Sequence, residues 1–104
     1  EHEHERFYYA AVPTVRVQQP SELCTIRPHC DGMYGLQAGS LNWWLPLTRV
    51  ASASTLHVES RPGSEDFAPL LPAPGEAVRF DGRRCLHYTL PNRSMRTRVS
   101  LDFR

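Results

Sequence analysis

Turn-forming residues divide this chain into short extended runs, and that spacing restricts its fold more than any other feature. Nine prolines in 104 residues, together with Gly, Asn and Asp between the runs, leave no window where a helical period lasts longer than a turn or two. The runs themselves are rich in β-branched and aromatic residues and alternate with polar ones, which is typical of strands. We therefore expect an all-β fold.

Seven strands are predicted, and many short strands at regular spacing indicate a sandwich or barrel, the jelly roll included. Residues 7–12 (FYYAAV) could add an eighth strand. We expect residues 1–11 to form a lead-in or first strand and residues 12–104 to form one β domain with a single core. The predicted strands are residues 15–19, 24–29, 41–50, 55–60, 77–80, 85–90 and 97–103.

Charge and hydropathy exclude some classes of partner. All twelve basic residues are arginines, and eleven acidic residues leave a net charge of +1, so no basic excess calls for nucleic acid or a membrane surface. The chain has no run of 18 apolar residues and no signal-peptide pattern at its start. We expect a cytoplasmic protein or an excised piece, with an oligomeric state that the sequence leaves open.

A His-x-Asp pair is the first chemical signal. On an extended segment His29 and Asp31 would point to one face, because alternate strand residues share a face. His87, separated from Asp31 by fifty-five residues, lies in another predicted strand and supplies a third ligand. Two histidines and one carboxylate with open positions suit a non-heme Fe(II) site, whereas structural zinc needs four closed ligands.

An Arg-x-Ser pair follows His87 after ten residues. Arg98 and Ser100 share one face of the last predicted strand, and we expect Arg98 to point inward with His87. A planar guanidinium fork beside a hydroxyl is a good receptor for the far carboxylate of a dicarboxylic acid. Arg96, at the preceding turn, is expected to be exposed.

These residues and the segments around them resemble a known family. HCD at 29–31, His87 and RVS at 98–100 are similar to the Fe(II)- and 2-oxoglutarate-dependent dioxygenases. The segments LNWWLPLT, STLHVESRPG and FDGRRCLHYTLPN resemble the phytanoyl-hydroxylase-related branch that includes streptomycin-biosynthesis-type proteins. The resemblance covers residues 12–104 and implies a double-stranded β-helix, which is a cupin-like jelly roll.

The resemblance also implies roles for individual residues. It implies hydroxylation of a small organic molecule or natural-product intermediate with O₂, releasing succinate and CO₂. The protein would hold the iron and exclude water, while the cofactor supplies the difficult chemistry. The implied Fe(II) ligands are His29, Asp31 and His87, and the residues implied near 2-oxoglutarate are Arg98, Ser100 and Asn42.

Alternatives remain open at this stage. One is a cupin-like metal protein with another chemistry, and a second is a truncated, non-catalytic core, since relatives carry N-terminal helices that this chain lacks. A zinc site from His29, Cys30, Cys85 and His87 is disfavoured, because neighbouring strand residues face opposite ways. An odd number of cysteines, Cys24 included, argues against a disulfide framework.

Two further side chains are assigned from parity and context. Trp44 shares parity with Asn42, so we expect it to face the pocket. His57 is interpreted as a structural or exposed histidine outside the metal site.

Overall fold

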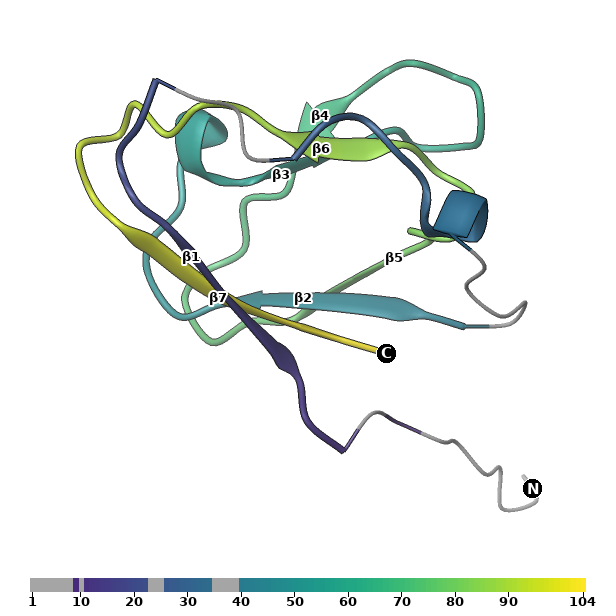
Figure 1. Ribbon diagram of the computed structural model, residues 1–104, viewed down its shortest axis with the longest axis horizontal. Coiled ribbons are helices and arrows are strands. Elements are labelled where there is room, and N and C mark those ends of the chain that lie inside the picture. Colours follow the sequence, from purple (N-terminus) through teal and green to yellow (C-terminus); the bar gives the residue numbers. More distant parts are fainter. Residues whose placement is uncertain (1–8, 10, 23–25, 35–39) are drawn as a thin grey trace.

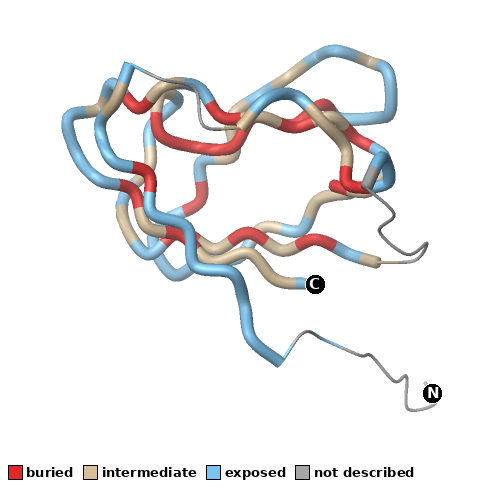
Figure 2. The backbone as a smooth tube through the Cα atoms, viewed as in Figure 1, coloured by how far each residue is buried: buried red, intermediate tan, exposed pale blue. Residues whose placement is uncertain are grey.

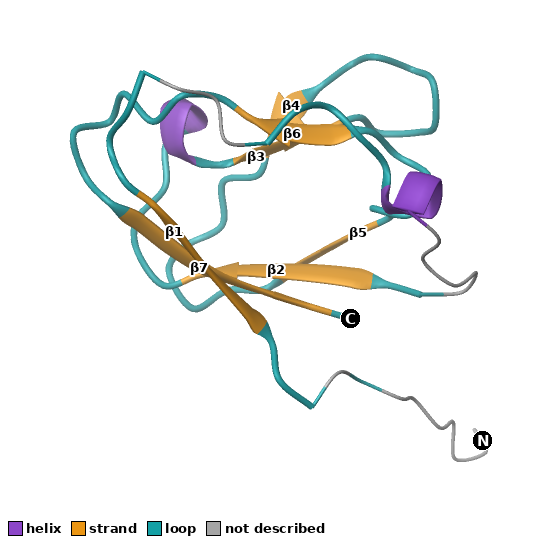
Figure 3. Cartoon of the chain, in the orientation of Figure 1, coloured by secondary structure: helices purple, strands orange, loops and turns teal. Residues whose placement is uncertain are grey.

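The computed structural model describes residues 9, 11–22, 26–34 and 40–104. Its elements in this part of the chain are seven short strands and two single-turn 3₁₀ helices (Figures 1 and 3). Within these described ranges, no helix has the length and apolar character needed to span a bilayer. The elements are β1 (Thr14–Gln18), η1 (Asp31–Tyr34), β2 (Asn42–Pro46), η2 (Ser52–Ser54), β3 (Leu56–Val58), β4 (Ala68–Pro69), β5 (Val78–Phe80), β6 (His87–Thr89) and β7 (Arg98–Phe103).

The strands form two antiparallel sheets that face one another as two layers (Figure 1). One sheet has four strands in the order β1-β7-β2-β5, and the other has three in the order β4-β3-β6. Strands far apart in sequence are therefore neighbours. Gln18 on β1 lies opposite Arg98 on β7, and Pro46 on β2 lies opposite Ser100. The expectation of an all-β fold is confirmed.

The four-stranded sheet is polar on the face that looks toward the other layer. Asn42 and Arg98 are buried on that face, as strand alternation predicts for residues of one parity. Its outer face is apolar, and Val15 and Val17 on β1 are 61% and 59% exposed. Figure 2 shows this exposure along β1 and the buried residues on the strands of both layers. The polar interior marks a site rather than an ordinary core.

The apolar core is small and lies toward one side of the space between the layers. Trp44 from β2 contacts Leu56 and Val58 from β3 and Cys85 from the segment before β6. The polar residues described above occupy the rest of the interior, so a single domain of this size places both a core and a polar cavity between the same two sheets.

Two strand predictions need correction, and one strand was missed. Residues 26–28 form no strand, and in the predicted strand at 24–29 only His29 forms a β-bridge, to His87, while residues 24 and 25 lie outside the described part. Of residues 7–12, the described ones, Tyr9, Ala11 and Val12, are not in a strand. The short strand β4 was not predicted, because Ala-Pro has little strand propensity and is placed by pairing with β3.

The His-x-Asp segment is not one extended strand either. Asp31 begins η1 instead, because Asp-Gly favours a turn, and the N–H of Met33 closes it on the carbonyl of Cys30 at 3.1 Å. The N–H groups of Asp31 and Gly32 bond the carbonyls of Gly82 and Arg83 at 2.7 and 2.8 Å. The turn after β5 thus holds this segment in place.

Candidate metal centre

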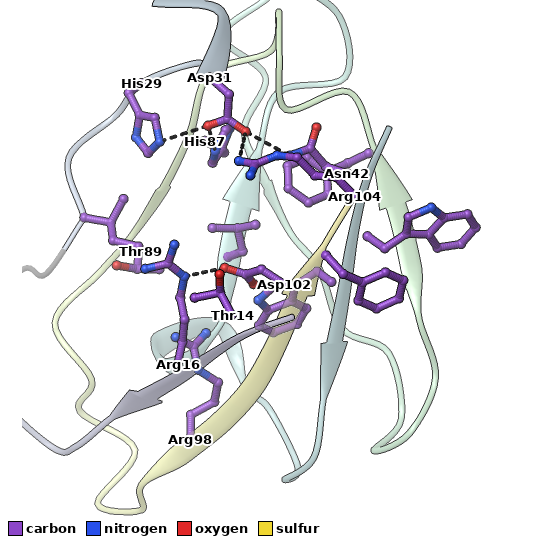
Figure 4. A pocket seen from close by; sticks show the side chains of 16 residues that line it. Thr14, Arg16, His29, Asp31, Asn42, His87, Thr89, Arg98, Asp102 and Arg104 are labelled. Carbon is purple, nitrogen blue, oxygen red and sulfur yellow. Dashed lines mark hydrogen bonds and ion pairs between the residues drawn. The ribbon is translucent and has the colours of Figure 1, made fainter. Parts of the chain in front are cut away.

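Three side chains converge at one end of the cavity between the sheets. His29 Nε2 and His87 Nε2 each lie 3.4 Å from Asp31 Oδ1, and the three ligand atoms lie within 4.8 Å of one another (Figure 4). The bridge between His29 and His87 brings two of them together, with paired backbone bonds of 3.1 and 2.9 Å. The predicted trio is therefore assembled, although a turn and a bridge replace the expected strand.

Backbone carbonyls orient both imidazoles. His29 Nδ1 lies 2.9 Å from the carbonyl of Arg27, and His87 Nδ1 lies 3.0 Å from the carbonyl of Cys85. A carbonyl oxygen can only accept, so each Nδ1 carries the donated hydrogen, and Nε2 is the ring nitrogen left to face the cavity. This carbonyl–histidine arrangement is typical of metal-binding histidines. Both Nε2 atoms thus face Asp31 Oδ1.

The two oxygens of the Asp31 carboxylate have different partners. Its Oδ1 faces the histidines, while its Oδ2 accepts bonds from Asn42 Nδ2 at 2.8 Å and Arg104 Nη2 at 3.2 Å. Burial alone would raise the pKa of Asp31, but contact with His87 and the bond from Asn42 outweigh burial and hold the pKa well below its usual range. The site therefore presents an ionised carboxylate beside two imidazole Nε2 atoms.

A cavity of about 80 Å³ opens from the three ligands into the space between the sheets. This volume holds several water molecules, so small polar groups can enter it. Residues from both sheets line it, and Trp44, predicted to face it, does so. Other lining residues include Thr14, Ile26, Leu56, Phe80 and Thr89.

Arg98 lines the same cavity, as predicted, and is only 3% exposed. Its Nη1 lies 3.4 Å from the carbonyl of Ser54, and its Nε is buried with no hydrogen-bond partner among the described residues. The guanidinium also lies over the Trp44 ring, 5.3 Å from the centroid. Burial lowers the pKa of Arg98 from its ordinary value, so the site favours an anion beside it.

The rest of the inner face of β7 is also polar. Ser100 is fully buried, and its Oγ has no hydrogen-bond partner among the described residues, but Ser100 is not among the cavity-lining residues. Asp102 does line the cavity, where its Oδ2 bonds Arg16 Nε and its Oδ1 has no partner in the described structure. Ser100 thus has the same parity as Arg98 on β7 but is not among the residues that line the cavity.

Residues assigned outside the centre behave differently. His57 Nε2 lies 2.8 Å from the carbonyl of Ser52, and its ring stacks on Tyr88 at 5.2 Å, which agrees with a structural histidine. Arg96 is exposed, as expected. Cys85 is buried, and burial raises the pKa of its thiol. Within the described residues the metal-ligand cluster contains no cysteine, and Cys24 lies outside them.

Sequence reasoning missed two arginines at the cavity. Arg16 and Arg104 both line it, and each holds an aspartate, Asp102 and Asp31 respectively. Parity could have found Arg104, since it follows Asp102 at an interval of two on β7's inner side. The bond between Asn42 and Asp31 was also missed, because no sequence pattern relates the two.

Comparison with known proteins agrees with this architecture. The solved structure of the non-heme monooxygenase ThoJ in a Ni complex matches with a TM-score of 0.67 at 18% identity, covering 88% of this chain and 42% of that one. This similarity shows a shared fold.

A sequence relative gives a second comparison. The chain is 31% identical over 97 residues to the streptomycin biosynthesis protein StrG of Streptomyces griseus, covering 93% of this chain and 45% of StrG. The chain therefore spans less than half the length of either protein. No family model matches the sequence. The first similarity shows a shared fold, and the second relates this chain to StrG over part of that protein's length.

Proposed function

We propose that this chain is the core of a non-heme Fe(II) oxygenase that uses 2-oxoglutarate to hydroxylate a small organic molecule. The observation that carries the proposal is one cavity with two histidines and a carboxylate at one end and the buried guanidinium of Arg98 lining it as well. The ligand set suits Fe(II) with open positions, and the unpartnered Nε of Arg98 suits a carboxylate. A cupin-like protein of other chemistry has no need of that guanidinium.

The strand order supports a double-stranded β-helix for this core. Successive segments β1, 26–29, β2, β3, β5, β6 and β7 alternate between the layers, apart from β4, which stays beside β3. Residue 29 lies against β6, where it extends the three-stranded sheet by a bridge. Such alternation between facing sheets is the arrangement of a jelly roll. The phytanoyl-hydroxylase-related branch stays a prediction on the motifs quoted above.

Two imidazoles and a carboxylate are a donor set that suits iron. His29, Asp31 and His87 would hold it on one side, and the ThoJ structure is a Ni complex of a protein with this fold. The chemistry supplied with iron, 2-oxoglutarate and O₂ bound is decarboxylation of the keto acid coupled to hydroxylation: substrate, 2-oxoglutarate and O₂ become alcohol, succinate and CO₂.

The chain's own residues position the reactants. The Arg98 guanidinium would pair with the C5 carboxylate of 2-oxoglutarate, compensating a buried charge that forms no ion pair among the described residues and is offset only in part by Asp102. Ser100 Oγ would donate to the same carboxylate or to a water next to it, and Asn42 lines the cavity at the cosubstrate's expected position. Trp44, 2% exposed, closes the apolar side and excludes water. The substrate and O₂ would enter the remaining space.

Anaerobic titration of Fe(II) and 2-oxoglutarate tests this function. Chelation of iron by the 1-carboxylate and 2-oxo groups should give a weak visible charge-transfer band that saturates at one equivalent. Succinate lacks the 2-oxo group and serves as the matched control, for which no band should appear. Iron that binds without producing the band on addition of 2-oxoglutarate would rule out the keto-acid chemistry.

A further inference from the structure

The side-chain amide of Asn42 lies between the Asp31 carboxylate and the turn that follows β5. Its Nδ2 donates to Asp31 Oδ2 at 2.8 Å, and its Oδ1 accepts the N–H of Gly82 at 3.2 Å. Asn42 is 6% exposed and both bonds are buried. A buried amide used at both ends has a fixed orientation, since exchanging its oxygen and nitrogen would lose both bonds.

The turn leaves no room for Asn42 to move. A Cβ at Gly82 would lie 2.8 and 2.9 Å from Cγ and Nδ2 of Asn42 and 2.7 Å from Cε2 of Phe80, closer than real Cβ contacts come. The backbone of Gly82 in turn accepts the N–H of Asp31 at 2.7 Å. Asp31 is therefore held through its main chain and its side chain by the same small unit, Asn42 with Gly82.

This unit selects one oxygen of Asp31 for the metal. With Oδ2 bonded to Asn42, only Oδ1 faces the two Nε2 atoms, each 3.4 Å away. A carboxylate free to rotate could offer both oxygens and occupy two coordination positions. Arg104 contacts the same Oδ2, but its side chain is 50% exposed, so solvent screens its contribution.

We propose that Asn42 is a positioning residue that makes Asp31 a one-oxygen metal ligand and so keeps coordination positions open for co-ligands. The proposal rests on the metal site of the proposed function and adds a role for Asn42 that is separate from any contact with 2-oxoglutarate. Gly82 belongs to the same unit, because only glycine leaves space for the amide.

Cobalt(II) is the probe, because its visible d–d absorption weakens as the coordination number rises and therefore reports how many ligand atoms are bound. Asn42→Ala and the similar-sized Asn42→Leu remove the donor to Oδ2. Each should lower Co(II) affinity about 10- to 100-fold, the usual cost of losing a group that orients a metal ligand. Each should also weaken the d–d absorption, as both oxygens of Asp31 bind.

Asn92→Ala is the matched control. Asn92 is a 1% exposed asparagine whose amide donates to the carbonyls of Gln18 and Arg96, outside the metal site. Its replacement should lower the melting temperature and leave Co(II) affinity and absorption as in wild type. Equal spectra and affinities for wild type and the Asn42 variants would overturn the positioning role alone. Failure of the wild type to bind Co(II) would overturn the proposed function as well.

Discussion

Glu59, directly after β3, and Arg98, on β7, are both buried charges, but their surroundings differ. Glu59, 2% exposed, accepts three backbone N–H groups, from Leu86 at 2.8 Å, Glu65 at 3.0 Å and Gly63 at 3.1 Å. Arg98, 3% exposed, has one long bond and an unpartnered Nε. A buried charge whose desolvation is offset by hydrogen bonds from the protein indicates a structural group. A buried charge without such hydrogen bonds indicates a group that binds a ligand.

The comparison extends to the two buried histidines. His57 bonds a carbonyl through Nε2 and stacks on Tyr88, while His87 bonds a carbonyl through Nδ1 and has its Nε2 facing Asp31. We expect His87→Ala to abolish stoichiometric Mn(II) binding and His57→Ala to retain it, because of these two histidines only His87 lines the cavity. Equilibrium dialysis with Mn(II) measures both. Equal losses in the two variants would show that the trio is misassigned.

Ligand binding should stabilise the protein, because the ligands would add contacts to Arg98 and to the metal-ligand trio. Mn(II) with 2-oxoglutarate, at a hundredfold excess over Kd, should add about 2.7 kcal/mol to the free energy of unfolding. For a domain of this size that corresponds to a rise of roughly 10–20 °C in melting temperature. Calorimetry should show a larger rise with both ligands than with either alone. An unchanged melting temperature at saturation would contradict a preformed site.

Glu59→Gln should lower the free energy of unfolding and leave the binding of Mn(II) and 2-oxoglutarate unchanged. Bonds from the N–H groups of Leu86, Glu65 and Gly63 lower the pKa of Glu59 from its ordinary value of 4.5. A carboxyl group whose pKa is lower in the folded than in the unfolded protein stabilises the folded state at pH values above the unfolded pKa. This stabilisation is lost as the pH falls through the folded pKa. Urea unfolding should therefore separate wild type from the variant at pH 7 and less at pH 3. A pH-independent difference would contradict this account.

Arg98→Met should produce the smallest change in the ligand-free protein. Asp102 offsets only part of the burial of Arg98, so removing the charge relieves a desolvation cost, and Met retains most of the packing against Trp44. The free energy of unfolding, measured by urea titration without metal, should be unchanged or higher than in wild type. A marked loss of stability would mean that Arg98 is a structural group like Glu59.

Sequence alone could predict the parts of the site that depend on strand periodicity. The alternation of two along β7 and β2 correctly placed Arg98 and Trp44 at the cavity. The same rule gave a wrong local structure for Asp31, because Asp-Gly forms a turn and the site is closed by a bridge instead of a strand. The trio still met, since His29 is fixed by pairing with His87.

The remaining features depend on contacts that leave no pattern in the sequence. Glu59 is held by main-chain N–H groups, which any residues could supply, so its role has no sequence signal. The fit of Gly82 against Asn42 joins residues 40 positions apart. Such contacts arise from the packing of one loop on another and are visible only in three dimensions.

Titration of 2-oxoglutarate into Mn(II)-loaded wild type and Arg98→Ala tests the central claim most directly. Loss of one partner of a buried charge pair costs about 2–5 kcal/mol, or roughly 30-fold to several-thousandfold in affinity. Arg98→Ala should lose that much affinity for 2-oxoglutarate with Mn(II) binding unchanged. Arg98→Lys should recover part of it, because an ammonium cannot reproduce the fork. The exposed Arg96→Ala should match wild type. Undiminished binding by Arg98→Ala would contradict the assignment of this cavity to 2-oxoglutarate.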